Sequence, residues 1–166
     1  ENGATVSSNA HMHEISGGGL AVLDYDLDSW PDLYLTQGGA EKPPNEQTGG
    51  PIDRLYRNLN GRIFTDVTEL TGITDSHFGQ GAAAGDYNND GWVDIFVANI
   101  GLNRLFINNG DGTFSDLTSA LQNNGDRWTM SAAIADVTRD AIPDIYAVNY
   151  LSLSSDVLQR LCKREG

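Results

Sequence analysis

Short runs of β-branched, aromatic and aliphatic residues alternate along the chain with clusters of Gly, Asn, Asp and Ser. This alternation is typical of antiparallel strands joined by tight turns. In the middle of the chain it predicts strands at 81–85, 94–99, 104–107 and 113–117. Before and after that stretch it predicts strands at 20–23, 33–36, 55–57, 63–67, 131–135 and 145–149. The expected fold class is therefore all-β.

The strand pattern repeats. Residues 55–58 and 63–68 match 105–108 and 113–118 at a constant offset of 50. Between the matched segments lie Asn-Gly turns at Asn60 and Asn109, which favour hairpins. A four-stranded antiparallel sheet that recurs every 40 to 50 residues or so is typical of a β-propeller blade. The sequence thus predicts blade units at about 15–70, 79–120 and 129–150 within one partial propeller spanning 1–166.

These units amount to about two and a half blades, whereas closed propellers have about four to eight. The chain is therefore expected to be an incomplete propeller, completed by further blades or by another chain. The first unit carries about twelve extra residues at 39–51, which the Pro, Gly and polar content predicts to be an exposed loop. The tail at 156–163 is expected to form a short amphipathic helix.

A loop with oxygen side chains at alternate positions lies between the first two strands of the second unit. Asp86, Asn88, Asp90 and Asp94 occupy loop positions 1, 3, 5 and 9, with a Gly at position 6. The free carbonyl of Trp92 at position 7 would add a further oxygen. Carboxylate, amide and carbonyl oxygens in a flexible loop suit Ca²⁺ better than the smaller Mg²⁺.

The same loop occurs once upstream and once downstream. The expected ligands in the three loops are Asp24, Asp26, Asp28, Trp30 and Asp32; Asp86, Asn88, Asp90, Trp92 and Asp94; and Asp136, Thr138, Asp140, Ile142 and Asp144. The Trp and Ile residues would contribute carbonyl oxygens. Ca²⁺ is expected in the first two loops, and whether the third also binds it is left undecided. The alternative is that the loops are solvated acidic turns without a metal.

The three loops differ in how well they suit Ca²⁺ binding. Position 6 is Ser29 in the first loop and Ala141 in the third, and a non-glycine residue held there at positive φ would cost about 1 kcal/mol. The first loop has the most carboxylates, and the second has the most favourable backbone. The third is weakest because it has Thr138 at position 3 and the positive Arg139 beside it.

The charge of the chain narrows the range of partners. The formal net charge is −13, which argues against nucleic acid or an anionic membrane surface as partner. Ten of the 23 acidic residues lie in the three loops, so much of the acidity is explained as cation ligation. No apolar run reaches the length of a membrane span, and the first residues do not resemble a signal peptide.

The repeated units resemble the FG-GAP/VCBS repeats of integrin-alpha-type propellers. The resemblance rests on DYDLDSWPDLYL, GDYNNDGWVDIFVAN and ADVTRDAIPDIYAVNY, joined by RLYRNLNGRIFTDVT and RLFINNGDGTFSDLT. The order of these segments is similar to that in cartilage-acidic-protein-like proteins with an ASPIC/UnbV region. The resemblance implies a propeller with more blades than this chain has, often seven, in proteins that are usually exported to an extracellular, periplasmic or cell-surface location.

Three functions remain open. The first is a noncatalytic Ca²⁺-binding propeller that acts in adhesion by presenting loops to a protein or glycan, as the resemblance implies. The second is an enzyme acting on sugars as a lyase or dehydratase, although the sequence shows no nucleophile with a base and so no catalytic residue is assigned. The third is a structural subunit of a larger assembly. The glycines of 79–85 are explained better by close strand packing than by phosphate binding.

Overall fold

The computed structural model describes residues 9–11, 13, 16–38, 50–122, 124–125, 127–153 and 161–163. Within these residues the chain is almost entirely β, as the sequence predicted. The first sheet contains β2 (Leu20–Leu23), β3 (Asp32–Leu35), β4 (Arg54–Leu59) and β5 (Ile63–Asp66). The second unit supplies β6 (Phe78–Gly85), β7 (Asp94–Ile100), β8 (Arg104–Asn108) and β9 (Phe114–Asp116), and the third supplies β10 (Arg127–Ala135) and β11 (Asp144–Ser152).

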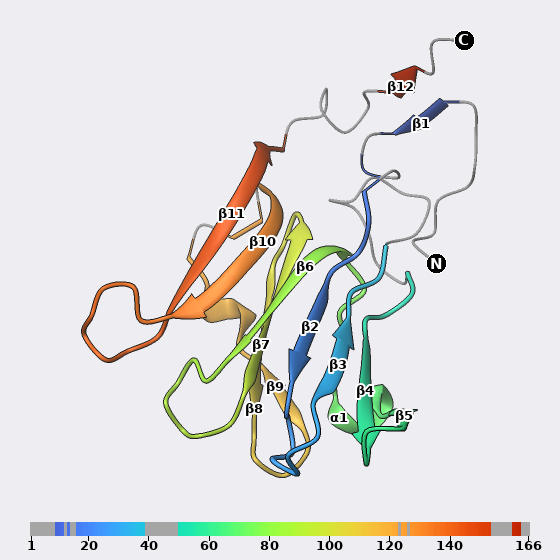
Figure 1. Ribbon diagram of the computed structural model, residues 1–166. Coiled ribbons are helices and arrows are strands. Elements are labelled where there is room, and N and C mark those ends of the chain that lie inside the picture. Colours follow the sequence, from blue (N-terminus) through green and yellow to red (C-terminus); the bar gives the residue numbers. More distant parts are fainter. Residues whose placement is uncertain are drawn as a thin grey trace.

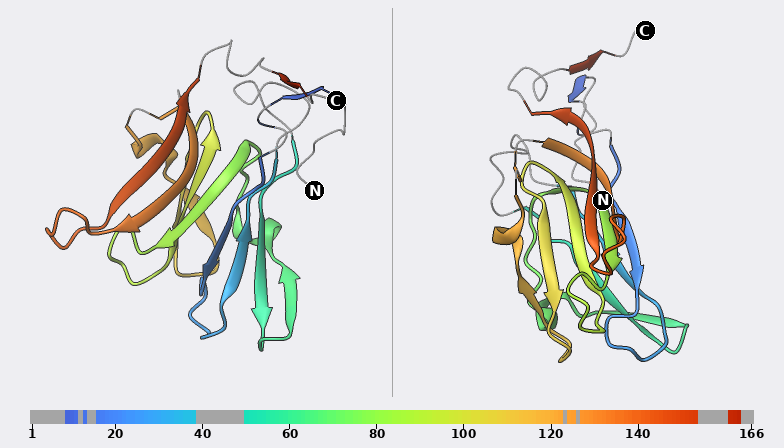
Figure 2. Two further views of the ribbon diagram at one scale, coloured as in Figure 1. Left: turned by 45° about the horizontal axis from the view of Figure 1, so that its top comes forward. Right: turned by 90° about the vertical axis from the view of Figure 1, so that its left-hand side faces the viewer.

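Each unit is an antiparallel meander in which successive strands pair. The units stand side by side and splay outward like segments of a fan (Figures 1 and 2). β6 lies against both β2 and β10, so the first strands of the three units are neighbours. Trp128 also pairs with Ile100, which joins the second and third units at one point. The prediction of partial propeller blades is confirmed.

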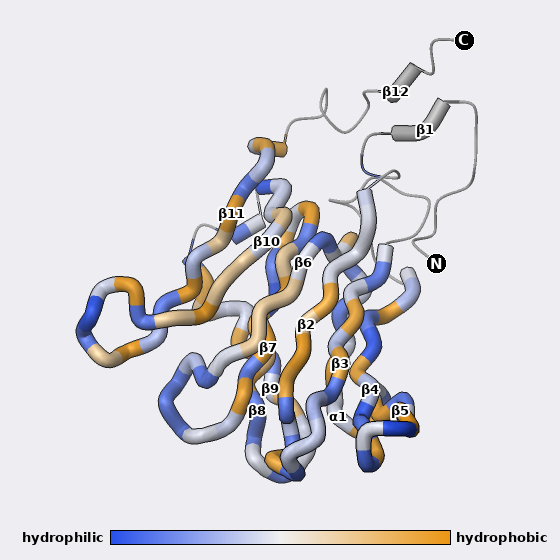
Figure 3. Tube along the Cα trace, viewed as in Figure 1, coloured by the Kyte–Doolittle hydropathy of each residue, from blue (hydrophilic) through white to orange (hydrophobic). Residues whose placement is uncertain are grey.

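Strand β7 forms the centre of the described structure because each of its residues is buried. Alternate side chains leave opposite faces of a strand. Ile95 and Val97 therefore join the apolar core shared with the first unit, whereas Phe96 and Ala98 join the core shared with the third. In Figure 3 the loop from β6 to β7 is mostly hydrophilic, in contrast to this buried strand. The predicted strand at 94–99 is confirmed, and the structure shows that it is buried.

Glycines allow the first strands of neighbouring units to approach closely. A Cβ atom added at Gly81 in β6 would lie 2.6 Å from the carbonyl oxygen of Met130 in β10. A Cβ atom added at Gly19, just before β2, would collide with the backbone of Gly81 itself. The structure thus supports close packing as the explanation for the glycine-rich stretch of the second unit.

Two helical turns and one terminal pairing differ from the sequence-based prediction. The segment after β5 forms the one-turn helix α1 (Thr68–Thr71), and the equivalent segment after β9 forms a 3₁₀ helix at Thr118–Ala120. The expected helix at 156–163 is wrong at its end, because β12 (Leu161–Lys163) pairs with β1 (Asn9–His11). Strand pairing with a distant segment overrides the local helical pattern there. The rest of that expected helix, and 39–49 of the predicted insertion, lie outside the described residues.

Candidate metal centres

The three acidic loops lie at one edge of the fan. They connect β2 to β3, β6 to β7 and β10 to β11, so each follows the first strand of its unit (Figure 1). Asn89 in the second loop donates its side-chain N–H to the carbonyl of Ala141 in the third, at 2.9 Å. The second and third loops are therefore neighbours.

In each loop the carboxylate at position 1 accepts backbone N–H groups of positions 5 and 6, so the loop folds back over this carboxylate. In the second loop Asp86 accepts the backbone N–H of Asp90 at 3.0 Å and that of Gly91 at 2.8 Å. In the first loop Asp24 accepts the N–H groups of Asp28 and Ser29 in the same way. Asp136 does so in the third loop, with Asp140 and Ala141 as donors. The three loops thus share one backbone framework despite their different side chains.

This framework places two residues of each loop in the left-handed region. Position 6 has φ of 71° at Ser29 and 67° at Ala141, as predicted from the missing glycines. Position 4 is also left-handed, at Leu27, Asn89 and Arg139, which the sequence analysis did not anticipate. Bulky side chains at such φ values carry strain, which the hydrogen bonds to the position 1 carboxylate offset.

Reciprocal substitutions at position 6 should shift stability in opposite directions. Ser29→Gly is expected to raise the free energy of unfolding by about 0.5 to 1 kcal/mol, because glycine adopts positive φ without strain. Gly91→Ala is expected to lower it by about 1 kcal/mol, since the added Cβ meets no atom within 4 Å and only backbone strain remains. Urea unfolding in metal-depleted buffer measures both. Equal signs for the two changes would contradict the shared framework.

The carboxylates at position 9 are held differently from the others. Asp94 is fully buried and accepts the N–H of Tyr87 and the N–H of Asn108, each at 2.8 Å. Asp32 makes the equivalent contacts with Tyr25 and Asn58. Burial raises the pKa of both carboxyl groups, and the backbone N–H groups oppose that rise. Each therefore ties its loop to the third strand of its own unit.

The side chains at positions 1, 3 and 5 are the ones that gather at a single point. Asp24, Asp26 and Asp28 each present an oxygen, and these oxygens lie within 4.8 Å of one another. They form the only such group of three or more His, Cys, Asp or Glu side chains in the described residues. Hard oxygen donors at this spacing fit a cation such as Ca²⁺.

The second and third loops hold fewer carboxylates together. Asn88 donates to Asp90 at 2.7 Å in the second loop, so amide and carboxylate lie side by side there. In the third loop the Thr138 hydroxyl donates to Asp144 at 3.2 Å, and Ile142 is exposed at position 7. A cation in the second loop would compete with the contact between Asn88 and Asp90 for the same oxygens.

The tryptophans at position 7 serve as supports for a neighbouring turn. The Trp30 ring lies over Gly61 in the β4–β5 turn, and the Trp92 ring lies over Gly110 in the β8–β9 turn. A Cβ atom at either glycine would come within 2.7 Å of the indole. The backbone N–H groups of the two tryptophans donate to the position 5 carboxylates of their loops at 2.9 and 2.8 Å. Each indole therefore lies close enough to its loop to report on an ion bound there.

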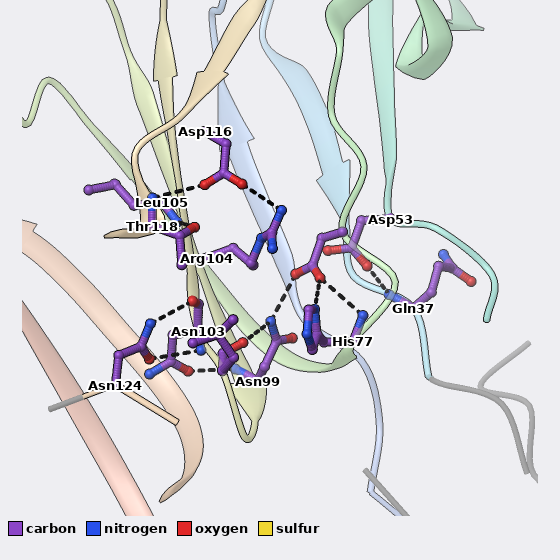
Figure 4. Close-up of polar contacts among 12 residues, drawn as sticks. Gln37, Asp53, His77, Asn99, Asn103, Arg104, Leu105, Asp116, Thr118 and Asn124 are labelled. Atoms are coloured by element: carbon purple, nitrogen blue, oxygen red, sulfur yellow. Dashed lines mark hydrogen bonds and ion pairs between the residues drawn. The ribbon is translucent and has the colours of Figure 1, made fainter. Parts of the chain in front are cut away.

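Sequence reasoning missed a polar cluster at the opposite ends of the strands. Asp53 accepts the Tyr34 hydroxyl and the Gln37 N–H, each at 2.7 Å, and its own N–H donates to the Asp75 carbonyl at 2.9 Å. The Asp75 carboxylate in turn receives the side-chain amide of Asn99 at 2.8 Å. Figure 4 shows Asp53, Gln37, His77 and Asn99 around this point. The cluster links the first unit to the second.

His77 and the asparagines complete the cluster. His77 contacts the Asp75 carboxylate through its ring Nδ1 at 2.6 Å and through its backbone N–H at 3.0 Å. Asn103 accepts the Asn99 N–H at 2.8 Å, the same contact that Asp53 makes with Gln37 (Figure 4). The one available sequence signal was this equivalence, since Asp53 and Asn103 both directly precede the third strand of their unit.

Replacing Asp53 by Asn should flatten the pH dependence of stability. Burial, and then the neighbouring Asp75, raise the pKa of Asp53 well above its usual range. The folded chain therefore keeps a proton that the unfolded chain releases above about pH 4, so this carboxyl favours folding at low pH and loses that contribution as pH rises. Asp53→Asn introduces the residue found at the equivalent position 103 and removes this pH-dependent contribution to stability.

Urea unfolding of both proteins between about pH 5 and pH 7 tests this. The stability of the wild type relative to the Asp53→Asn variant should decline as pH increases. Groups that are common to both proteins contribute to both profiles, so their contribution cancels in the difference. Parallel profiles would mean that Asp53 does not hold a proton in the folded state.

Comparisons with known proteins agree with the fold and the loops. A family model for the FG-GAP-like repeat matches residues 24–97 and 86–147, each match beginning at the first aspartate of a loop. The chain belongs to the FG-GAP-like repeat family. It resembles Cartilage acidic protein 1 of Homo sapiens, with 27% identity over 98% of this chain and 27% of that protein. The same protein from Xenopus tropicalis is 30% identical over 98% of the chain and 24% of the relative.

The chain thus spans about a quarter of the length of the curated relatives that it matches. The resemblance expected from the loop and strand segments is confirmed. In the part of the chain that the structure describes, no helix is both long enough and apolar enough to cross a membrane.

Proposed function

We propose that this chain is part of a Ca²⁺-binding propeller that serves as an extracellular or cell-surface module for binding a protein or a glycan. The observation that carries the proposal is the shared loop framework, which presents three oxygen-rich turns on one face. The names of the relatives refer to an acidic protein of cartilage, and this chain is likewise acidic, at −13. Further blades of the same repeat would complete the ring, with 15–70, 79–120 and 129–150 as units of it.

The bound ion would act on stability. Asp24, Asp26 and Asp28 repel one another unless positive charge lies beside them, and the equivalent positions of the second loop are Asp86, Asn88 and Asp90. A cation held there would fix the turn between the first two strands of each unit. Ca²⁺ accepts six to eight oxygens in flexible geometry, whereas Mg²⁺ demands a tight octahedron, so Ca²⁺ suits these loops better.

Calcium should raise the melting temperature of the chain. If the sites have dissociation constants of ~0.1 to 1 mM, as in extracellular modules, ~1 mM Ca²⁺ adds roughly 0.4 to 1.4 kcal/mol per site. Two sites together give a rise of a few degrees. Thermal melts in EGTA and in Ca²⁺ measure the difference. Asp90→Ala should remove one increment, and Asp140→Ala should matter least because Thr138 and Arg139 weaken the third loop.

An unchanged melting temperature on chelation, together with absent Ca²⁺ binding by calorimetry, would show that the loops are only acidic turns. The proposed binding role has its own test. Arrays of purified matrix proteins and glycans, probed with the chain in Ca²⁺ and in EGTA, should give Ca²⁺-dependent binding. Binding that is identical in both buffers would separate the ligand role from the metal.

A further inference from the structure

An arginine from another strand lies among the carboxylates of the first loop. The Arg57 guanidinium approaches Asp26 with Nε at 2.6 Å and Asp28 with Nη2 at 3.0 Å. Arg57 belongs to β4, the third strand of the unit, so its side chain reaches across the sheet edge to the loop. Two of the three carboxylates that gather in the first loop are therefore already paired with a positive charge.

The second loop has no such partner among the described residues. The equivalent of Arg57 is Ile107, because Asn58 and Asn108 directly after them make the same contact with the position 9 carboxylates. Strand register agrees, since Arg57 pairs with Thr65 and Ile107 with Ser115 at the same step of their hairpins. The two units thus differ at one position that faces the loop.

The pairing in the first loop is incomplete. Asp26 Oδ1 is buried and accepts no hydrogen bond from the described residues, and the contact of Arg57 Nε lacks hydrogen-bond alignment. Asp26 therefore retains one carboxylate oxygen without a hydrogen-bond donor. Arg57 thus offsets part of the negative charge of Asp26 and Asp28 without satisfying every oxygen.

We infer that Arg57 is a built-in counter-cation that competes with a divalent ion for the first loop. The inference rests on the proposed Ca²⁺ binding and adds a regulator to it. A divalent ion entering the loop must displace the guanidinium from Asp26 and Asp28 or bind beside it. The first loop has the most carboxylates, but its Ca²⁺ affinity is consequently lower than its number of carboxylates alone would predict.

Electrostatics sets the expected size of the effect. A unit positive charge a few ångströms from a divalent ion weakens its binding by about tenfold or more even in a water-like environment. Arg57→Gln removes the charge and keeps a polar side chain, so it should tighten Ca²⁺ binding to the first loop by about tenfold. Arg57→Ile, which copies the second unit, should do the same. Arg57→Lys keeps the charge and should leave the affinity within about threefold of the wild type.

The loops can be read separately through their own tryptophans. Trp30 and Trp92 lie in the first and second loops. Terbium luminescence excited at the red edge of the indole absorption, where Tyr25 and Tyr87 do not absorb, reports the first loop in a Trp92→Phe background and the second in a Trp30→Phe background. Competition of bound terbium by Ca²⁺ then gives the Ca²⁺ affinity of each loop. Arg57→Gln should shift the titration in the first background and leave it unchanged in the second.

A second readout is the melting temperature, measured first without metal and then with Ca²⁺. In metal-depleted buffer Arg57→Gln should lower the melting temperature, because Asp26 and Asp28 lose their partner, and Ca²⁺ should restore more of it than in the wild type. Equal first-loop affinities for wild type and Arg57→Gln, with clear binding in the second loop, would overturn the role of Arg57. Absence of binding in both loops would instead overturn the proposed Ca²⁺ function.

Discussion

Replacing Gly81 with alanine is expected to lower the free energy of unfolding by about 3 kcal/mol. The added Cβ would lie 2.6 Å from the Met130 carbonyl oxygen and 3.2 Å from the Ser131 Cα. Both atoms belong to the backbone of β10, which cannot move aside as a flexible side chain could. The first strands of the second and third units would have to separate, and apolar contacts such as those of Phe96 would loosen.

Urea unfolding followed by the fluorescence of Trp128, which is buried where the second and third units meet, measures this loss. Gly17→Ala is the matched control, because a Cβ there meets no atom within 4 Å. Its stability should stay within about 0.5 kcal/mol of the wild type. If Gly81→Ala behaved like the control, close packing of the first strands would not be what the glycine provides.

The repeat, the strands and the loops were predictable because their signals are local. Alternating side chains and Asn-Gly turns specify each hairpin, and a constant offset of 50 makes one unit support the interpretation of the next. The structure extends the predicted strand at 131–135 to 127–135, because Trp128 pairs across the unit boundary with Ile100. Strand ends depend on such distant partners and are not visible in the local pattern.

The left-handed backbone at position 4 had no local signal. Leu27 and Arg139 are residues that avoid positive φ, yet both adopt it, at 56° and 64°. The cause lies at position 1, where Asp24 and Asp136 accept the N–H groups that follow and curl the chain. A hydrogen-bond pattern thus overrides residue preference, and only the geometry of the whole loop reveals it.

The polar cluster and Arg57 were missed because they depend on contacts between segments far apart in the chain. Asp53, Asp75 and Asn99 are separated by more than twenty residues from one another, and they meet only when the first two units pack together. Arg57 stands 29 residues from Asp28, and its role emerges once β4 is aligned beside the loop. The alignment of the first two units did show one relevant difference, because Arg57 in the first unit aligns with Ile107 in the second.

Asp94 is expected to be more important for folding than for holding an ion. Removing it in Asp94→Ala leaves the buried N–H of Asn108 and the part-buried N–H of Tyr87 without their acceptor. A buried unsatisfied donor costs about 1 to 3 kcal/mol and a part-buried one less, so the free energy of unfolding should fall by about 2 to 4 kcal/mol. The loss would also free the second loop from β8, the strand that carries Asn108.

Performing the measurement in EGTA separates this structural role from metal ligation. The loss for Asp94→Ala should persist without Ca²⁺, because the two hydrogen bonds need no ion. Asp144→Ala is the control, since the N–H groups that Asp144 accepts, from Val137 and Thr138, lie in an exposed loop where water can replace the carboxylate. It should cost less than about 1 kcal/mol. A loss for Asp94→Ala that vanished on chelation would assign this carboxylate to the metal and not to the fold.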